Sequence, residues 1–194
     1  ADFNLNLLTR RLKAFELTHL NDYDLLLPLS AVDARLLEHL GCKKPIFIHP
    51  FGIDTDTIPY LPAATAPMSL YHIGSMDWLP NQEGIHYFLE QIMPKITKAL
   101  PDLQLYLAGR NMPAYYFTNH WKNVVVLGEV ADALAFERDK SVLVVPLLSG
   151  GGVRIKIFQA MAMVKTVITT SVGAEGIEAR PGEELIIAET PQDF

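Results

Sequence analysis

The sequence predicts an α/β protein with a doubly wound parallel sheet. Between residues 69 and 188, short β-rich runs alternate with segments of helical spacing, which is the pattern of successive βαβ units. Glycines directly follow several of these runs, as in tight strand-to-helix turns. Hydrophobic residues make up 49% of the 194 residues, so the chain can bury a sizeable core.

The pattern of residues 1–50 predicts a partial α/β segment that forms the tail of a domain preceding the main one. Helical spacing covers residues 7–20 and 31–40, and apolar runs at 24–29 and 46–49 predict strands. Ser30 suits the start of the second helix and Gly41 its end. Prolines then break regular structure and predict a linker over residues 51–68.

Residues 69–194 predict the main domain. In chain order the sequence predicts a strand over 69–73, a helix over 81–100 that is interrupted or ends near Pro94, a strand over 103–108, a weak helix over 113–120, a strand over 124–127, a helix over 131–137, a strand over 142–145, a helix over 153–163, and strands over 166–170 and 184–188. A further helix is expected to begin at Thr190. Because the first residue is Ala1 rather than Met, we expect a fragment of a longer protein.

Composition excludes several classes of function. The net charge of −6 argues against a general nucleic-acid binder. The single cysteine, Cys42, excludes an internal disulfide framework and fits a reducing compartment. No apolar run approaches the roughly 20 residues that cross a bilayer, and secretory signal features are absent. The six histidines lack metal-ligand spacing, and neither Gly-x-Ser-x-Gly nor the dinucleotide fingerprint occurs.

The run from Ser149 to Gln159 carries the strongest functional signal. Gly150, Gly151 and Gly152 join an apolar strand to an amphipathic helix. Glycine lets backbone N–H groups approach an anion, and a helix start adds positive partial charge. Because Arg154 and Lys156 add full charges there, the run predicts a phosphate or diphosphate site. It is not a P-loop, since no Gly-Lys-Ser/Thr closes it.

Glycine-containing loops follow three further predicted strands. They begin at Gly74, Gly109 and Gly128. Ligands of open α/β sheets bind outside the carboxyl ends of strands, so the repeated glycines predict close backbone approach along one rim. Any single loop could equally be a tight turn.

The order of motifs resembles the donor-binding half of a two-Rossmann (GT-B) glycosyltransferase of the family 4 kind. The segments that carry the resemblance are Gly74-Ser-Met-Asp-Trp-Leu-Pro-Asn-Gln-Glu-Gly-Ile85, Leu107-Ala-Gly-Arg110, Val126-Leu-Gly-Glu-Val130, Val145-Pro-Leu147, the block from Gly150 to Ala162, and Thr169-Thr-Ser-Val-Gly-Ala-Glu-Gly-Ile177. Upstream, residues 23–30 and 50–54 resemble the end of the acceptor domain and its hinge.

The resemblance implies roles for individual residues. The donor diphosphate would be held by Gly150, Gly151, Gly152, Arg154 and Lys156; the nucleoside would be bound by Arg110, Gly128, Glu129, Val130 and Gln159; and the sugar side would involve Gly74, Ser75, Asp77 and Glu175. At about 100° per residue, both cations reach one diphosphate only if the helix starts at or after Arg154.

Several of these residues have plainer alternatives. Arg154 could be a solvated charge, Arg110 a surface arginine and Glu175 a solvated loop acid. Asp77 could cap the following helix, and Trp78 could simply pack the loop at Gly74 onto the sheet.

The sequence departs from the family pattern at two places. Family 4 enzymes often carry a Glu-x7-Glu pair where this chain has Gly151 and Gln159, and glutamine brings no charge. Val164 stands where a turn glycine is usual. A β-branched residue in a left-handed turn costs about 1–2 kcal/mol, so this turn is either different or strained.

The resemblance implies a retaining, hexosyltransferase-type enzyme that uses a nucleotide diphosphate-sugar and no metal. Its acceptor would be a saccharide or lipid-linked hydroxyl in polysaccharide biosynthesis, at the cytoplasmic side or peripherally at the inner face of the membrane. Acid/base residues would lie mostly in the missing acceptor domain, so the catalytic residues are unknown and the fragment should turn over little. The alternatives are a non-catalytic nucleotide-binding module and a sugar-nucleotide epimerase.

Overall fold

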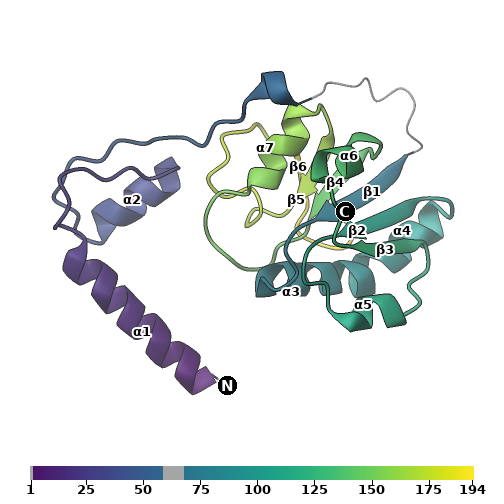
Figure 1. The fold of residues 1–194 in the computed structure, drawn as a ribbon, viewed down its shortest axis with the longest axis horizontal. Helices are drawn as coiled ribbons and strands as arrows, with labels where there is room; N and C mark the ends of the chain where they lie inside the picture. Colours follow the sequence, from purple (N-terminus) through teal and green to yellow (C-terminus); the bar gives the residue numbers. More distant parts are fainter. Residues whose placement is uncertain (1, 59–67) are drawn as a thin grey trace. The chain divides into compact units, whose positions relative to one another are not determined.

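The computed structural model describes residues 2–58 and 68–194 (Figure 1). The chain divides into two compact units, Ala1–Phe51 and Gly52–Phe194, which we call the first and second unit. The predicted linker over residues 51–68 lies partly outside the described residues.

The first unit contains two helices, α1 (Asp2–His19) and α2 (Ala31–His39). Ser30 caps α2 as predicted, since its Oγ accepts a hydrogen bond from the Asp33 backbone N–H at 3.1 Å. The strands predicted over residues 24–29 and 46–49 are wrong: a single parallel bridge joins Leu26 and Ile46. Pro28 and Pro45 remove ladder donors there, and a two-stranded pair without a third strand is marginal.

The second unit is built on the predicted parallel, doubly wound sheet. Its strands lie in the order β3-β2-β1-β4-β5-β6, and every pair is parallel. Their bounds are β1 Ser69–Ile73, β2 Gln104–Ala108, β3 Val124–Gly128, β4 Val142–Val145, β5 Thr166–Thr169 and β6 Ile186–Ile187.

The helices of the second unit lie close to their predicted positions. They are α3 Leu79–Tyr87, a π-helical segment Phe88–Ile92, α4 Met93–Ala99, α5 Ala114–Thr118, α6 Ala133–Arg138 and α7 Ile155–Ala162. The predicted interruption near Pro94 is the π-helical segment, because proline supplies no N–H to the preceding turn. The helix expected at Thr190 is only a turn, in which the Asp193 carboxylate accepts from the Thr190 N–H at 2.8 Å.

Alternate residues of the central strands serve two cores, one on each face of the sheet. Helices α3, α4 and α5 cover one face, where Leu70 and Val144 are buried. Helices α6 and α7 cover the other, where Tyr71 and Val145 are buried (Figure 1). Burial on both faces explains why these strands are continuous apolar runs rather than alternating ones.

Val164 ends α7 in the left-handed region, with φ +57°, and its side chain is 63% exposed. The strain anticipated for this turn is therefore present. We expect Val164→Gly to raise the free energy of unfolding by about 0.5–1 kcal/mol, because relief of strain exceeds the entropy that glycine adds to the unfolded chain. Urea denaturation measures this change. Val153→Gly, at a position without positive φ, should be destabilising, and a loss of stability at position 164 as well would contradict the account.

Candidate functional site

The site lies where the strand order reverses, between β1 and β4. In a doubly wound sheet the connections after two such strands leave toward opposite faces, and a crevice opens at their carboxyl ends. Here the loop after β1 holds Gly74 to Trp78, and the loop after β4 holds the glycine run and Arg154. The two loops meet, since the Arg154 guanidinium lies 5.0 Å from the centre of the Trp78 ring. Trp78 thus packs against the glycine run as well as closing its own loop.

The predicted glycine rim is confirmed. The Gly74 N–H donates to Ala108 O at 3.2 Å, and the Gly109 N–H donates to Gly128 O at 2.7 Å. A Cβ on Gly109 would lie 1.8 Å from the Gly74 carbonyl oxygen. The backbones at the ends of β1 and β2 are therefore too close for a side chain at Gly109, whereas a Cβ on Gly128 would meet the Phe117 ring at 2.9 Å.

The glycine run leaves an open corner beside this rim. Gly150 and Gly152 have φ of +111° and +85°, a region that favours glycine. No atom of the residues that the structure describes lies within 4 Å of a Cβ built on Gly151 or Gly152, and both residues are exposed. Backbone groups of the run are therefore accessible to an incoming ligand.

Arg154 is buried, with 7% of its surface exposed, so the interpretation as a solvated charge is wrong. Its Nη1 donates to Gly151 O at 2.6 Å. Its Nε and Nη2 are buried and have no hydrogen-bond partner among the described residues. Burial lowers the pKa of Arg154, and the charge of Glu175 opposes this shift. Two buried donor nitrogens without acceptors are costly, and their positive charge suits an anion.

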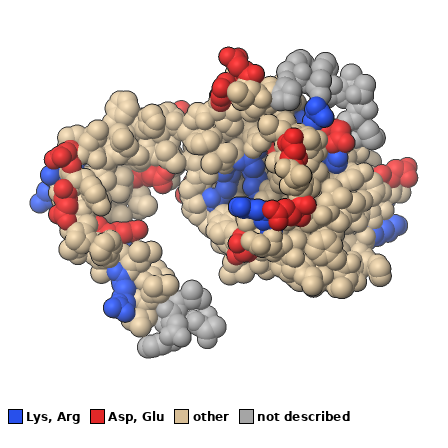
Figure 2. Space-filling view, viewed as in Figure 1, with Lys and Arg blue, Asp and Glu red and all other residues tan. Residues whose placement is uncertain are grey.

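Helix α7 begins at Ile155, with Arg154 as its N-cap residue. The condition under which both cations can reach one diphosphate is therefore met. Figure 2 shows Lys and Arg atoms recessed in the surface of the second unit, on the side that carries α7 in Figure 1.

The Lys156 amine lies beneath the rim. Its Nζ is 3.4 Å from His72 Nε2 and 3.3 Å from Asn81 Oδ1, and a Cβ on Gly74 would be 2.6 Å from it. Part of the lysine side chain is exposed, but the amine is enclosed. Burial, and after it the charge of Arg154, lower the pKa of Lys156 to about 7, while the charge of Glu137 opposes this shift. Sequence reasoning missed Asn81, and it identified His72 only as a surface or satisfied core residue.

Two of the four predicted sugar-side residues, Ser75 and Asp77, form a small network with Asn111 from the loop after β2. Ser75 Oγ donates to Asp77 Oδ1 at 2.6 Å, and Asn111 Nδ2 donates to Asp77 Oδ2 at 2.9 Å. These hydrogen bonds lower the pKa of Asp77, so the exposed carboxylate stays ionised. Asp77 does not cap α3, whose N-cap residue, Trp78, makes no side-chain capping bond. Glu175 is exposed.

A pocket of about 220 Å³ brings together five of the predicted site residues. It is lined by Ile73, Gly74, Ser75, Gly109, Arg110, Glu129, Val130 and Ala133. Gly128 precedes this lining directly, with φ +69°. Gln159 lies one turn after Lys156 on α7 and does not line the pocket. Three of the five predicted nucleoside residues, Arg110, Glu129 and Val130, thus share one cavity with two predicted sugar-side residues, whereas Gly128 and Gln159 do not line it.

A family model described as glycosyl transferases group 1 matches residues 67–194. The chain belongs to this family. The match covers the whole sheet and every predicted ligand-binding residue.

Known relatives of this group 1 chain extend well beyond it. An uncharacterized 44.6 kDa protein in the cps region of Klebsiella pneumoniae is 26% identical over 125 residues, which cover 60% of this chain and 32% of that protein. The crystal structure of TarM has a TM-score of 0.72 at 15% identity, covering 93% of this chain and 37% of that one. HepE of Anabaena, solved with UDP and glucose, has a TM-score of 0.71 at 14% identity, covering 93% and 54%. These structures confirm the fold, and the chain spans between a third and about half of these proteins.

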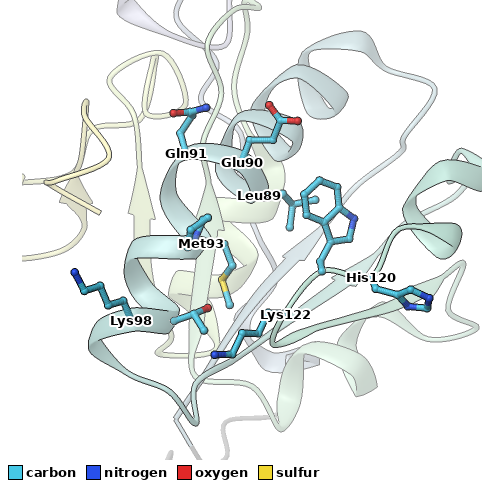
Figure 3. Close-up of a pocket in the computed structure, with 10 residues that line it drawn as sticks. Leu89, Glu90, Gln91, Met93, Lys98, His120 and Lys122 are labelled. Carbon is cyan, nitrogen blue, oxygen red and sulfur yellow. The ribbon is translucent and has the colours of Figure 1, made fainter.

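A second cavity of the group 1 chain lies elsewhere. It has a volume of about 720 Å³ and is lined by the π-helical segment, α4 and the residues before β3. Figure 3 shows Leu89 and Met93 beside this cavity, with Lys98, His120 and Lys122 around it. None of the predicted site residues lines it. Because it lies toward the amino ends of the strands, it is not where an α/β sheet binds its ligand.

The described residues lack two further features. No group of three or more His, Cys, Asp or Glu side chains there is arranged to hold a metal ion. No helix in the described ranges is long and apolar enough to pass through a bilayer.

Proposed function

We propose that this chain is the donor-binding part of a hexosyltransferase that moves a sugar from a nucleotide diphosphate-sugar to a hydroxyl acceptor with retention. The observation that carries the proposal is the buried Arg154 guanidinium, with two N–H donors unpartnered beside an open glycine run. A diphosphate supplies both the hydrogen-bond acceptors that Arg154 lacks and the negative charge that balances the guanidinium.

The main contribution of these residues is stabilisation of the leaving group. As the bond from sugar to phosphate breaks, negative charge grows on the nucleoside diphosphate. Arg154, Lys156 and the backbone N–H groups of residues 150–152 would neutralise that charge. Arg110 and the backbone of Gly128, Glu129 and Val130 would hold the nucleoside in the 220 Å³ pocket, while Gln159 would reach the ribose. Asp77, Ser75 and Glu175 would face the sugar.

The charges at this corner bear on whether the reaction needs a metal ion. Two cations and several amides can balance a diphosphate without a metal ion, so we propose a metal-independent enzyme. We also propose a saccharide or lipid-linked acceptor in polysaccharide biosynthesis, at the cytoplasmic side with peripheral membrane contact. The UDP and glucose bound to HepE support a nucleotide-sugar as the donor.

Calorimetric titration of the chain with UDP, GDP and ADP tests the proposal. One nucleotide should bind saturably, and Lys156→Ala should abolish the binding because the enclosed cation is lost. Lys98→Ala, in the 720 Å³ cavity, is the matched control and should bind as the unaltered chain does. Failure to bind any of the three nucleotides, or unchanged binding by Lys156→Ala, would overturn the proposal.

A non-catalytic nucleotide-binding module remains the second candidate. Gly151 and Gln159, which leave the site without the acidic pair of the resemblance, favour it. Such a module would bind a nucleotide and yet leave a nucleotide-sugar intact when reassembled with its acceptor domain. The epimerase alternative has no support from His72, whose ring is directed to β4 and Lys156 rather than into the pocket.

A further inference from the structure

The Lys156 amine is held by two acceptors that carry no charge. His72, on β1, offers Nε2 at 3.4 Å, and Asn81, on α3, offers Oδ1 at 3.3 Å. These two contacts fix the position of the Lys156 amine, but among the described residues no carboxylate contacts the amine to balance its charge.

His72 accepts from the lysine because its other nitrogen is occupied. The residue is 1% exposed, and Nδ1 lies 2.9 Å from the Val144 carbonyl oxygen, to which it can only donate. A single proton on Nδ1 leaves Nε2 as an acceptor. Burial, followed by the lysine charge, keeps the pKa of His72 well below its ordinary value, so the ring stays neutral.

The other charged groups that face Lys156 do not balance its charge. Arg154 repels it, and Glu137 on α6 attracts it. Glu137 is itself 1% exposed and accepts a hydrogen bond from the Tyr71 hydroxyl at 3.1 Å. Burial raises the pKa of Glu137 to about 7, so this carboxyl is partly protonated at neutral pH. The protein therefore surrounds the amine with less than one full negative charge.

We propose that His72 and Asn81 are positioning residues that hold Lys156 ready for a phosphate anion, so that donor binding brings a proton onto the lysine. This inference rests on the proposed function, because the donor diphosphate is the anion that supplies the missing counter-charge. The lowered pKa of Lys156, about 7, supports the same conclusion. A bound dianion restores that pKa toward its ordinary value, and by linkage the affinity depends on pH.

The direction in which UDP affinity changes with pH follows from the protonation state of Lys156. Only protonated Lys156 pairs with the diphosphate, and above pH 7 the unliganded chain loses that proton. UDP should therefore bind about 5- to 10-fold more weakly at pH 8.5 than at pH 7.5, with uptake of close to one proton. In this range the terminal phosphate of UDP is already ionised, since its last pKa is near 6.

Substitutions at positions 156 and 72 distinguish a role of His72 in positioning Lys156 from a role in the stability of the fold. Lys156→Arg carries a charge that does not titrate, so its affinity should not change between the two pH values. His72→Asn keeps an N–H for Val144 O but loses the acceptor for Lys156, so it should bind UDP at least 3-fold more weakly at pH 7.5. Loss of the acceptor also shifts the pH profile to lower pH. His72→Gln returns an acceptor and should recover part of the affinity.

The experiment is calorimetric titration of the chain with UDP at pH 7.5 and 8.5, in two buffers of different ionisation enthalpy. In parallel, NMR of ¹³C-lysine-labelled chain follows the Lys156 resonance, assigned with Lys156→Arg, without nucleotide. Affinity that does not change with pH, or a Lys156 amine that titrates at its ordinary value, overturns the inference. A different result is that UDP does not bind, although Lys156 titrates near 7 and its pKa shifts in His72→Asn. In that case the positioning role of His72 stands and the assignment of the donor fails.

Discussion

Gly109→Ala should lower the free energy of unfolding by more than about 3 kcal/mol. A Cβ at this position would lie 1.8 Å from the Gly74 carbonyl oxygen. Neither strand end can move away freely, because backbone hydrogen bonds join Gly74 to Ala108 and Gly109 to Gly128. The substitution must break the rim or leave the chain partly unfolded. Urea denaturation followed by far-UV circular dichroism measures the loss.

Gly151→Ala is the matched control for the rim. This glycine also lies at the site, but its φ is not positive and, within the described parts of the chain, no atom lies within 4 Å of the added Cβ. Its stability should change by less than about 0.5 kcal/mol. Equal losses for the two variants would show that the close approach of the strand ends is not what the rim requires.

Arg154→Met should weaken nucleotide binding by a factor of about 100 while leaving the fold as stable as before, or more stable by up to about 1 kcal/mol. The arginine is buried with Nε and Nη2 unpartnered, and removing such donors relieves a desolvation cost of about 1–3 kcal/mol. Loss of the contact with Trp78 and of the bond to Gly151 O offsets part of this gain. The binding loss corresponds to one charge-assisted contact with a diphosphate.

Unfolding curves and calorimetry on the same preparation measure both effects of Arg154→Met. Arg180→Met is the control, since Arg180 is exposed and pairs with Glu183 and Glu184 in a different loop. It should change neither stability nor affinity. If Arg154→Met destabilised the fold and spared binding, the arginine would be a structural residue.

The sequence was enough to predict the sheet, because each central strand is an apolar run that ends at a turn residue. The same reasoning failed at residues 24–29 and 46–49, where the apolar runs are present but prolines and the absence of a third strand leave one bridge. A strand needs neighbours, and a local pattern does not reveal how many it has.

The site was predictable only where the signal is local. The glycines after β1, β2 and β3 mark the rim, and Val164 marks its strained turn, because each restricts its own backbone. Contacts between distant residues left no such mark: Arg154 stacks on Trp78, and Lys156 meets Asn81. Beside three glycines an arginine is expected to be exposed, and nothing in the sequence indicated that a tryptophan from the first loop covers it.

The strand order also determines when each strand can pair while the chain is being synthesised. Strand β1 lies at the middle of the sheet, yet its neighbour β4 begins at Val142, 69 residues after Ile73. At a synthesis rate of 5–20 residues per second, this edge of β1 would wait roughly 3–14 s for its partner. During that interval the nascent chain presents an unpaired apolar edge, which is the kind of surface that chaperones bind.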